Sequence, residues 1–127
     1  MQQGQKQSTH LLATSTSRDG ETMVLTCSGS AETEALESLN AVLNGLHQDV
    51  VSNSTRNVIA DVRGLEFASS SCLKAFVTWL QRVQELDDSH RYQILFRSNP
   101  SHSWQRRSLG ALAAFASGVV RIESEAQ

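Results

Sequence analysis

The stretch NVIADVRGLEFASSSCLKAF, residues 57–76, joins a strand pattern directly to a helix pattern. It opens with NVIADV, which is apolar almost throughout and typical of a strand buried on both faces of a parallel sheet. The only charge inside that run is Asp61. Apolar residues then return at helical spacing, at Leu73, Phe76, Val77, Leu80 and Val83. The stretch therefore predicts a buried strand, a short connector RGLE, and a helix that begins near a run of serines.

Towards the N-terminus, the sequence predicts a hairpin and then a helix. Leu11 to Thr16 and Met23 to Cys27 have strand composition and are separated by the turn signal SRDG. Gly29 and Ser30 are expected to break the second strand. Residues 31–47 then place apolar side chains on one helical face, at Leu36, Leu39, Val42, Leu43 and Leu46. The polar linker VSNSTRN leads from this helix to the central strand.

Towards the C-terminus, the alternation continues with a strand at Tyr92 to Phe96, a helix over residues 103–116 and a last strand around Val119 to Ile122. The order β-β-α-β-α-β-α-β predicts an α/β fold with a mixed, mostly parallel β-sheet flanked by α-helices and joined by right-handed crossovers. Functional sites in such sheets form at the carboxyl ends of the strands. The segment FASSSC, residues 67–72, follows the central strand at that end.

Composition limits the classes of function. The chain has 127 residues, enough for one domain over residues 11–123 after an expected flexible tail, residues 1–10. A net charge of -2 argues against binding a nucleic-acid backbone. The tail lacks the apolar core of a signal peptide, and no run is long enough to span a membrane. Two isolated cysteines, Cys27 and Cys72, indicate neither a disulfide framework nor a metal cluster, so we expect a cytoplasmic protein.

The residues Ser69, Ser70, Ser71 and Cys72 leave three interpretations open. One serine is enough to cap the following helix. A nucleophilic serine needs a base, but the elbow G-x-S-x-G is absent and no histidine has a spacing that pairs it with Ser70; the histidines are His10, His47, His90 and His102. A phosphorylated serine at a helix N-terminus would lie among free backbone amides and change the local charge.

The layout resembles the STAS domain (SpoIIAA-like), the family of bacterial anti-sigma-factor antagonists. In that family a buried strand and a connector precede Phe-x-Asp-Ser-Ser-Gly-Leu at the start of a helix. Phe67 matches the aromatic residue, Ser70 the regulated serine, Ser71 its neighbour and Leu73 the first core residue. Two positions depart from the pattern, because Ser69 stands where the family has Asp and Cys72 where it has Gly.

The same segment also resembles the SiaC-like biofilm regulators, a divergent branch of the fold with an Asn-Thr-Ser-Ser-Ile-Lys-Ala stretch. Aligning its lysine with Lys74 again brings Ser70 to the phosphoacceptor position, with Ser69 in the place of the Asn. Both resemblances therefore imply Ser70 as the acceptor, with Ser69 and Ser71 as alternates.

The resemblance implies a non-enzymatic regulator without catalytic residues, metal or cofactor, which binds a partner protein until the serine is phosphorylated. The implied partners are an anti-sigma factor with serine kinase activity, a PP2C-type phosphatase, or a diguanylate cyclase as in the SiaC-like branch, with no nucleic acid and no membrane. The implied docking residues are Phe67, Ser69, Ser71, Cys72, Lys74 and Thr78. Two alternatives remain: a constitutive interaction or scaffold module of the same fold, and a small hydrolase that uses Ser70 or Cys72.

A second polar cluster, NPSHSWQRRS at residues 99–108, lies near the start of the third predicted helix. Arginines beside an aromatic side chain can bind phosphates or nucleic acid, but the acidic chain disfavours this. We expect Ser101 or Ser103 to cap the helix, Trp104 to pack on the edge of the core, and Arg106 and Arg107 to be solvated. If this loop lies beside FASSSC, these arginines would help to orient a partner.

Overall fold

A computed structural model describes residues 11–124; the predicted tail, residues 1–10, lies outside the described residues. The order of elements agrees with the expected alternation of strands and helices. The elements are β1 (Ala13–Asp19), β2 (Thr22–Ala31), the short 3-10 helix η1 (Thr33–Ala35), α2 (Leu36–Ser52), β3 (Asn57–Ala68), α3 (Ser70–Gln84), β4 (Gln93–Ser98), α4 (Ser103–Phe115) and β5 (Val120–Ser124).

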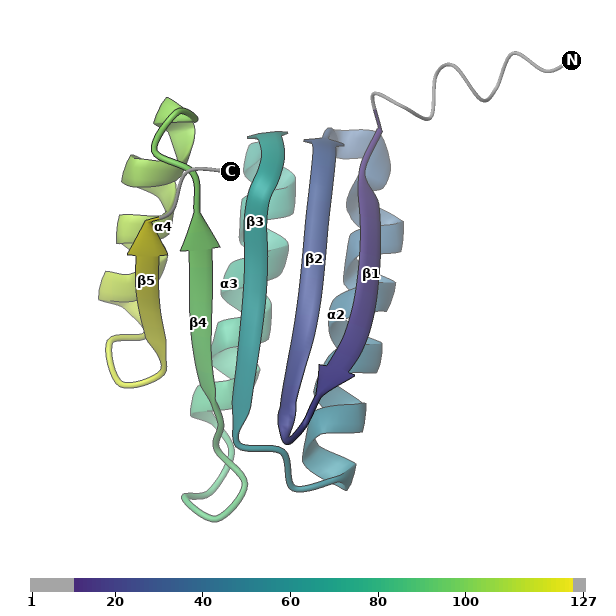
Figure 1. Ribbon diagram of the computed structural model, residues 1–127, viewed down its shortest axis with the longest axis vertical. Helices are drawn as coiled ribbons and strands as arrows, with labels where there is room; N and C mark the ends of the chain where they lie inside the picture. The colour runs from purple at the N-terminus through teal and green to yellow at the C-terminus, as the bar shows by residue number, and fades with distance from the viewer. Residues whose placement is uncertain (1–10, 125–127) are drawn as a thin grey trace, which may run out of the picture.

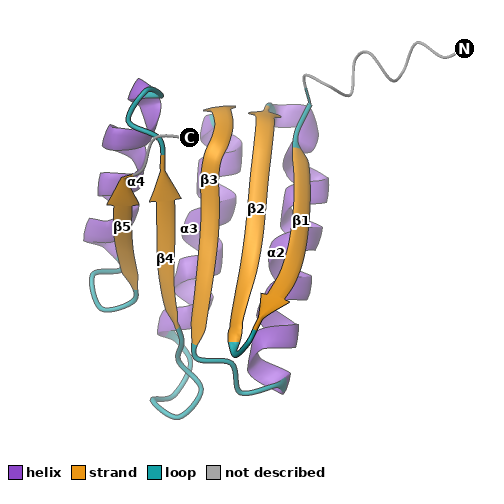
Figure 2. Ribbon diagram, in the orientation of Figure 1, coloured by secondary structure: helices purple, strands orange, loops and turns teal. Residues whose placement is uncertain are grey.

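Residues 11–124 form one five-stranded sheet in the order β1-β2-β3-β4-β5. The first pair is antiparallel and the other three pairs are parallel, which confirms the predicted mixed, mostly parallel sheet. Each crossover moves one strand further in the same direction, so right-handed connections place α2, α3 and α4 on a single face. Figure 1 shows α2, α3 and α4 behind the sheet, and Figure 2 separates the two layers by colour.

The one-sided arrangement corrects the expectation that NVIADV is buried on both faces. Val58, Ala60 and Val62 face the helices and are at most 1% exposed. The alternate residues Ile59 and Asp61 lie on the open face and are only partly buried. There Asp61 accepts from the Arg63 guanidinium, with an Oδ2 to Nη2 distance of 2.8 Å. This hydrogen bond is the main reason that the pKa of Asp61 is lowered.

The central strand is longer than predicted, because the expected connector RGLE belongs to β3. Gly29 and Ser30 also remain inside β2, where they mark a register shift instead of the predicted break. Gly29 has φ of 86°, and a Cβ there would meet the carbonyl oxygen of Leu11 at 2.1 Å, so only glycine fits. The two strands therefore stay paired to their ends, where Ala31 lies opposite Ala68.

The core between sheet and helices is aromatic at its centre and contains a buried polar chain. Phe76, Trp79 and Phe96 lie with ring centroids 6.1 to 6.4 Å apart. The Trp79 indole donates to the Tyr92 hydroxyl at 2.9 Å, and that hydroxyl lies 2.8 Å from Nδ1 of His47. Because the indole is only a donor, the hydroxyl accepts from Trp79 and donates to His47, which requires a neutral imidazole with its proton on Nε2.

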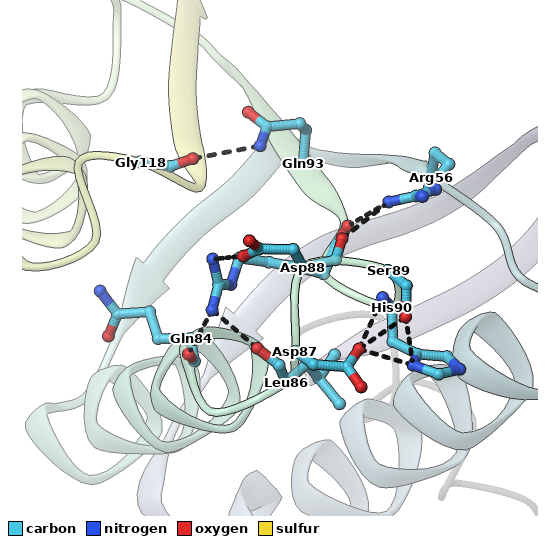
Figure 3. A network of polar contacts seen from close by, with 10 residues as sticks. Arg56, Gln84, Leu86, Asp87, Asp88, Ser89, His90, Gln93 and Gly118 are labelled. Atoms are coloured by element: carbon cyan, nitrogen blue, oxygen red, sulfur yellow. Dashed lines mark hydrogen bonds and ion pairs between the residues drawn. The ribbon is translucent and has the colours of Figure 1, made fainter.

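Two arginines hold the connection between α3 and β4, which lies at the N-terminal ends of the parallel strands, the end of the sheet opposite to FASSSC. Arg91 donates to a carboxylate oxygen of Asp88 at 2.9 Å and to the carbonyl of Leu86 at 2.7 Å. Arg56 donates to the carbonyls of Asp88 and Arg91, at 3.2 Å each. Figure 3 shows this network of polar contacts. It satisfies carbonyls of a loop that has no strand partners of its own.

The buried imidazole makes stability depend on pH. Burial, and then the charge of Arg82, lower the pKa of His47 from 6.5, so the unfolded chain binds a proton more readily than the folded one. This contribution is fully present above pH 6.5 and is lost as the pH falls below it. We expect the free energy of unfolding in urea to fall over that range in the wild type and to fall less in His47→Gln. The matched variant His102→Gln, which removes a histidine whose ring makes no hydrogen bond among the described residues, should keep the wild-type slope; equal slopes in all three proteins would contradict the assignment.

Candidate functional site

The serine run forms the N-terminus of α3, at the carboxyl end of β3. Ser69 is the N-cap: its backbone is extended, and its Oγ accepts from the Cys72 amide at 3.2 Å. Its carbonyl accepts from the Leu73 amide at 2.9 Å, and its own amide donates to the carbonyl of Ala31 at 2.8 Å. One residue therefore joins the ends of β2, β3 and α3. The hydroxyl of Ser69 supplies the capping oxygen at the position where the resembled family has Asp.

Because Ser69 caps the helix, the Ser70 side chain is not needed for capping, and it makes no hydrogen bond among the described residues. Ser70 is the first residue of the helix and is exposed, whereas Ser71 is partly buried. The first amides of a helix have no partner within it, and Ser69 satisfies those of Cys72 and Leu73. The amides of Ser70 and Ser71 remain for solvent or an anion, in the end of the helix where the dipole favours negative charge.

Cys72 faces inward, unlike its serine neighbours. Its side chain is 0% exposed, and its thiol donates to the carbonyl of Glu32 at 3.3 Å. The predicted docking role for Cys72 therefore does not fit, because its sulfur contributes no surface. Instead, the hydrogen bond from the thiol to Glu32 joins the connection between β2 and α2 to the first turn of α3. In the family pattern Gly occupies this position, so the extra side chain here is accommodated inside the core.

The remaining predicted docking residues lie on the surface around the helix start. Phe67 is 44% exposed, although it belongs to β3. Lys74 and Thr78 are exposed on α3, one and two turns beyond Ser70. A large aromatic side chain left exposed to solvent is a feature enriched at protein-binding surfaces.

Gln105, a polar residue that is 1% exposed, is a structural residue that was not predicted from the sequence. Its side-chain amide donates to the carbonyls of Val62 and Leu65, at 2.7 and 2.9 Å, and its oxygen accepts from the amide of Asn99 at 2.8 Å. Pairing of β3 with β4 ends at Asp61, so Gln105 satisfies strand carbonyls that β4 no longer reaches. A signal was available, because Gln105 shares a helical face with Leu109 and Leu112.

Residues 99–108, which comprise a short loop and the first turns of α4, contact β3 at Arg63 and Leu65, close to the start of FASSSC; that these residues orient a partner stays a prediction. The Trp104 indole donates to the carbonyl of Leu65 at 3.2 Å, and Asn99 donates to that of Arg63 at 3.4 Å. Trp104 is partly buried and Arg106 and Arg107 are exposed. The predicted cap is wrong: the N-cap of α4 is His102, which makes no side-chain capping bond.

Histidines and metal ligands do not assemble at the serine run within residues 11–124. His47 is bonded to Tyr92, His90 to Asp87, and no hydrogen bond joins a described histidine to Ser70. No group of three or more His, Cys, Asp or Glu side chains in the described range could hold a metal ion. None of the described helices is long and apolar enough to cross a membrane.

The fold resembles that of a solved bacterial regulator. The crystal structure of an anti-sigma factor antagonist from Mycobacterium paratuberculosis matches this chain with a TM-score of 0.61. The chain has the STAS fold of these antagonists. Sequence identity is 16%, and the match covers 81% of this chain and 80% of that one. No model of a protein family matches the sequence, and no curated protein is significantly similar to it. The STAS fold is thus recognised here through its backbone.

The cap assignment predicts different costs for adjacent serines. Ser69→Ala removes the acceptor of the Cys72 amide and should lower the free energy of unfolding by about 1 kcal/mol, while Ser69→Asp, which keeps an acceptor, should lose little. Ser70→Ala is the matched control and should be nearly neutral. Urea denaturation measures all three, and an equal loss in Ser69→Ala and Ser70→Ala would contradict the assignment.

The three hydrogen bonds of the Gln105 side chain, here called the Gln105 clamp, predict a large loss of stability when Gln105 is replaced by an apolar residue of similar size. Gln105→Leu removes the side-chain partner of the Val62 carbonyl and of the Asn99 amide and leaves the Leu65 carbonyl with Trp104 alone, so it should destabilise the fold by about 2–4 kcal/mol. Hydrogen exchange should also accelerate at the end of β3. The control Gln81→Leu changes an exposed glutamine on α3 and should stay within about 0.5 kcal/mol of the wild type. A loss no larger than that of the control would show that the clamp adds nothing.

Proposed function

We propose that this protein is a non-enzymatic, cytoplasmic signalling regulator that binds a partner protein through the start of α3 and releases it when Ser70 is phosphorylated. One observation carries the proposal: Ser69 caps the helix, so the exposed Ser70 is left available at its first position. A kinase can modify Ser70 without removing the hydrogen bond that starts α3. The STAS fold, with its solved anti-sigma factor antagonist, supports this class of function.

The switch would operate by charge. Phosphorylation adds a charge of about -1.5 to -2 and three acceptor oxygens, which the free amides at the start of α3 would stabilise within the protein itself. In a complex, the same phosphate would lie at the centre of a packed contact and would have to lose its water. The modified protein would therefore be stable alone and unable to dock.

The proposed docking surface consists of Phe67, Ser71, Lys74 and Thr78 around Ser70, with the edge of Ser69. Phe67 would insert into an apolar pocket of the partner, and Lys74 would pair with an acidic group. The arginines of α4, Arg106 and Arg107, are candidates for orienting the partner, since their helix starts beside the end of β3. We propose an anti-sigma factor with serine kinase activity as partner, a PP2C-type phosphatase for reversal, and a diguanylate cyclase as the alternative target.

A constitutive STAS-fold module is the second candidate. It is favoured by one observation, that the carboxylate preceding the acceptor serine in the resembled family is a hydroxyl here, on Ser69. If the kinase requires that carboxylate, the surface would bind its partner without being switched.

The test uses partner proteins captured from the native cell with the wild-type chain, followed by titration of the purified partner. Ser70→Asp should weaken binding at least about tenfold, equivalent to about 1.4 kcal/mol, and Ser70→Ala should retain it. The matched control Ser117→Asp adds the same charge at an exposed position in the loop before β5 and should bind like the wild type.

Equal binding by Ser70→Asp and wild type, together with loss of binding in Phe67→Ala, would favour the constitutive module. Unchanged binding in both variants would reject the proposed surface altogether.

A further inference from the structure

The strand β5 forms one outer edge of the sheet, paired within residues 11–124 only with β4. The amide of Ile94 donates to the carbonyl of Val119 at 2.9 Å, which sets the direction of the backbone groups along β5. Since these groups alternate along a strand, those of Arg121 and Glu123 point towards β4. The N–H and C=O of Ile122 point away from the sheet, ready to pair with another strand.

The charges on β5 limit which strand can pair with it. Arg121 and Glu123 lie on the open face of the sheet, beside Leu95 and Arg97 of β4. Glu123 lies 3.5 Å from the Arg97 guanidinium, and Arg121 has no ion-pair partner among the described residues. When two such strands pair in antiparallel fashion, the positive residue of each strand lies opposite the negative residue of the other. The strand is therefore complementary in charge to a second copy of itself.

We propose that two copies of this chain associate through β5, antiparallel and centred on Ile122, to form one continuous sheet. In this register Ile122 exchanges both backbone hydrogen bonds with Ile122 of the second copy. Arg121 of each copy then lies opposite Glu123 of the other, on the open face. Glu123 would be flanked by Arg97 of its own chain and by Arg121 of the second copy, so each unpaired arginine gains a carboxylate.

Side chains on the helix-covered face fit the same arrangement. Ile122 is 38% exposed and lines a groove of about 230 Å³ together with Arg106 and Leu109. A twofold axis perpendicular to the sheet keeps the helices of both copies on one face, so the two α4 helices would run side by side. Gly110 and Ala113, four and seven residues after Arg106, share its side of α4. These small residues leave room for the second helix.

Alternative registers lose this match. A shift of two residues along β5 removes both Arg121 to Glu123 pairs, and a shift of one turns outward-pointing backbone groups away from each other. The other outer strand, β1, has Ser15 and Ser17 on either side of its central residue and offers no charge pair there. The contact is small, as expected of a weak and reversible dimer.

The proposed dimer contact is on β5, whereas Ser70 follows β3 at the start of α3. The strand β4 lies between β3 and β5, so the two surfaces are separate. A dimer would therefore present two copies of the proposed docking surface. Failure of the dimer leaves the phosphorylation proposal unaffected, and failure of the switch leaves the dimer unaffected.

The test is sedimentation velocity of the full chain from about 10 µM to about 1 mM at low salt, a range that detects association free energies of roughly -7 to -4 kcal/mol. We expect a concentration-dependent dimer that added salt weakens. Arg121→Glu and Glu123→Arg should each weaken association at least tenfold, because each brings like charges together. An equimolar mixture of the two variants should form a heterodimer, because both charge pairs are then restored.

The control variant Glu37→Arg reverses an exposed charge on α2 and should dimerise like the wild type. Recovery in the mixture shows that both variants are folded. A chain that stays monomeric throughout this range would overturn the proposal. A dimer that Arg121→Glu does not weaken, or two variants that fail to recover when mixed, would overturn it as well.

Discussion

The parallel pairing of β2 and β3 over their whole length is the constraint on which the rest of the structure depends. Because the two strands remain in contact to Ala31 and Ala68, the amide of Ser69 meets a carbonyl at the end of β2. That hydrogen bond fixes the point at which the chain leaves the sheet, and the Ser69 hydroxyl caps the first turn of α3 directly after it. The position of Ser70 is thus determined by backbone pairing on one side and by a cap on the other.

The order of elements could be predicted because apolar periodicity changes cleanly between strands and helices. The length of β3 could not, since RGLE contains two charges and a glycine and is typical of a loop. It is strand because β2 pairs with it through register shifts and because Gln105 and Trp104 satisfy carbonyls that β4 does not reach. Such support comes from residues some forty positions away, which no local pattern contains.

The candidate site shows the same division between local and distant causes. The residue types alone predicted that one serine would cap the helix. Only the extended backbone of Ser69 shows which serine it is. From the sequence, Cys72 is expected among the docking residues, whereas its thiol is buried and donates to the carbonyl of Glu32, which directly follows β2. Similarly, NVIADV has the composition of a strand with helices on both faces, and only the strand order places the described helices, α2, α3 and α4, on one face.

The central claim is that Ser70, left free by the Ser69 cap, is the residue that a kinase modifies. The most direct measurement is tandem mass spectrometry of the protein isolated from its own cells, with each phosphate assigned to a single serine. The account predicts one phosphate on Ser70 and none on Ser69, whose hydroxyl is engaged in the cap. Phosphate on Ser69, or a protein that is unmodified in all growth conditions while bound to its partner, would contradict it.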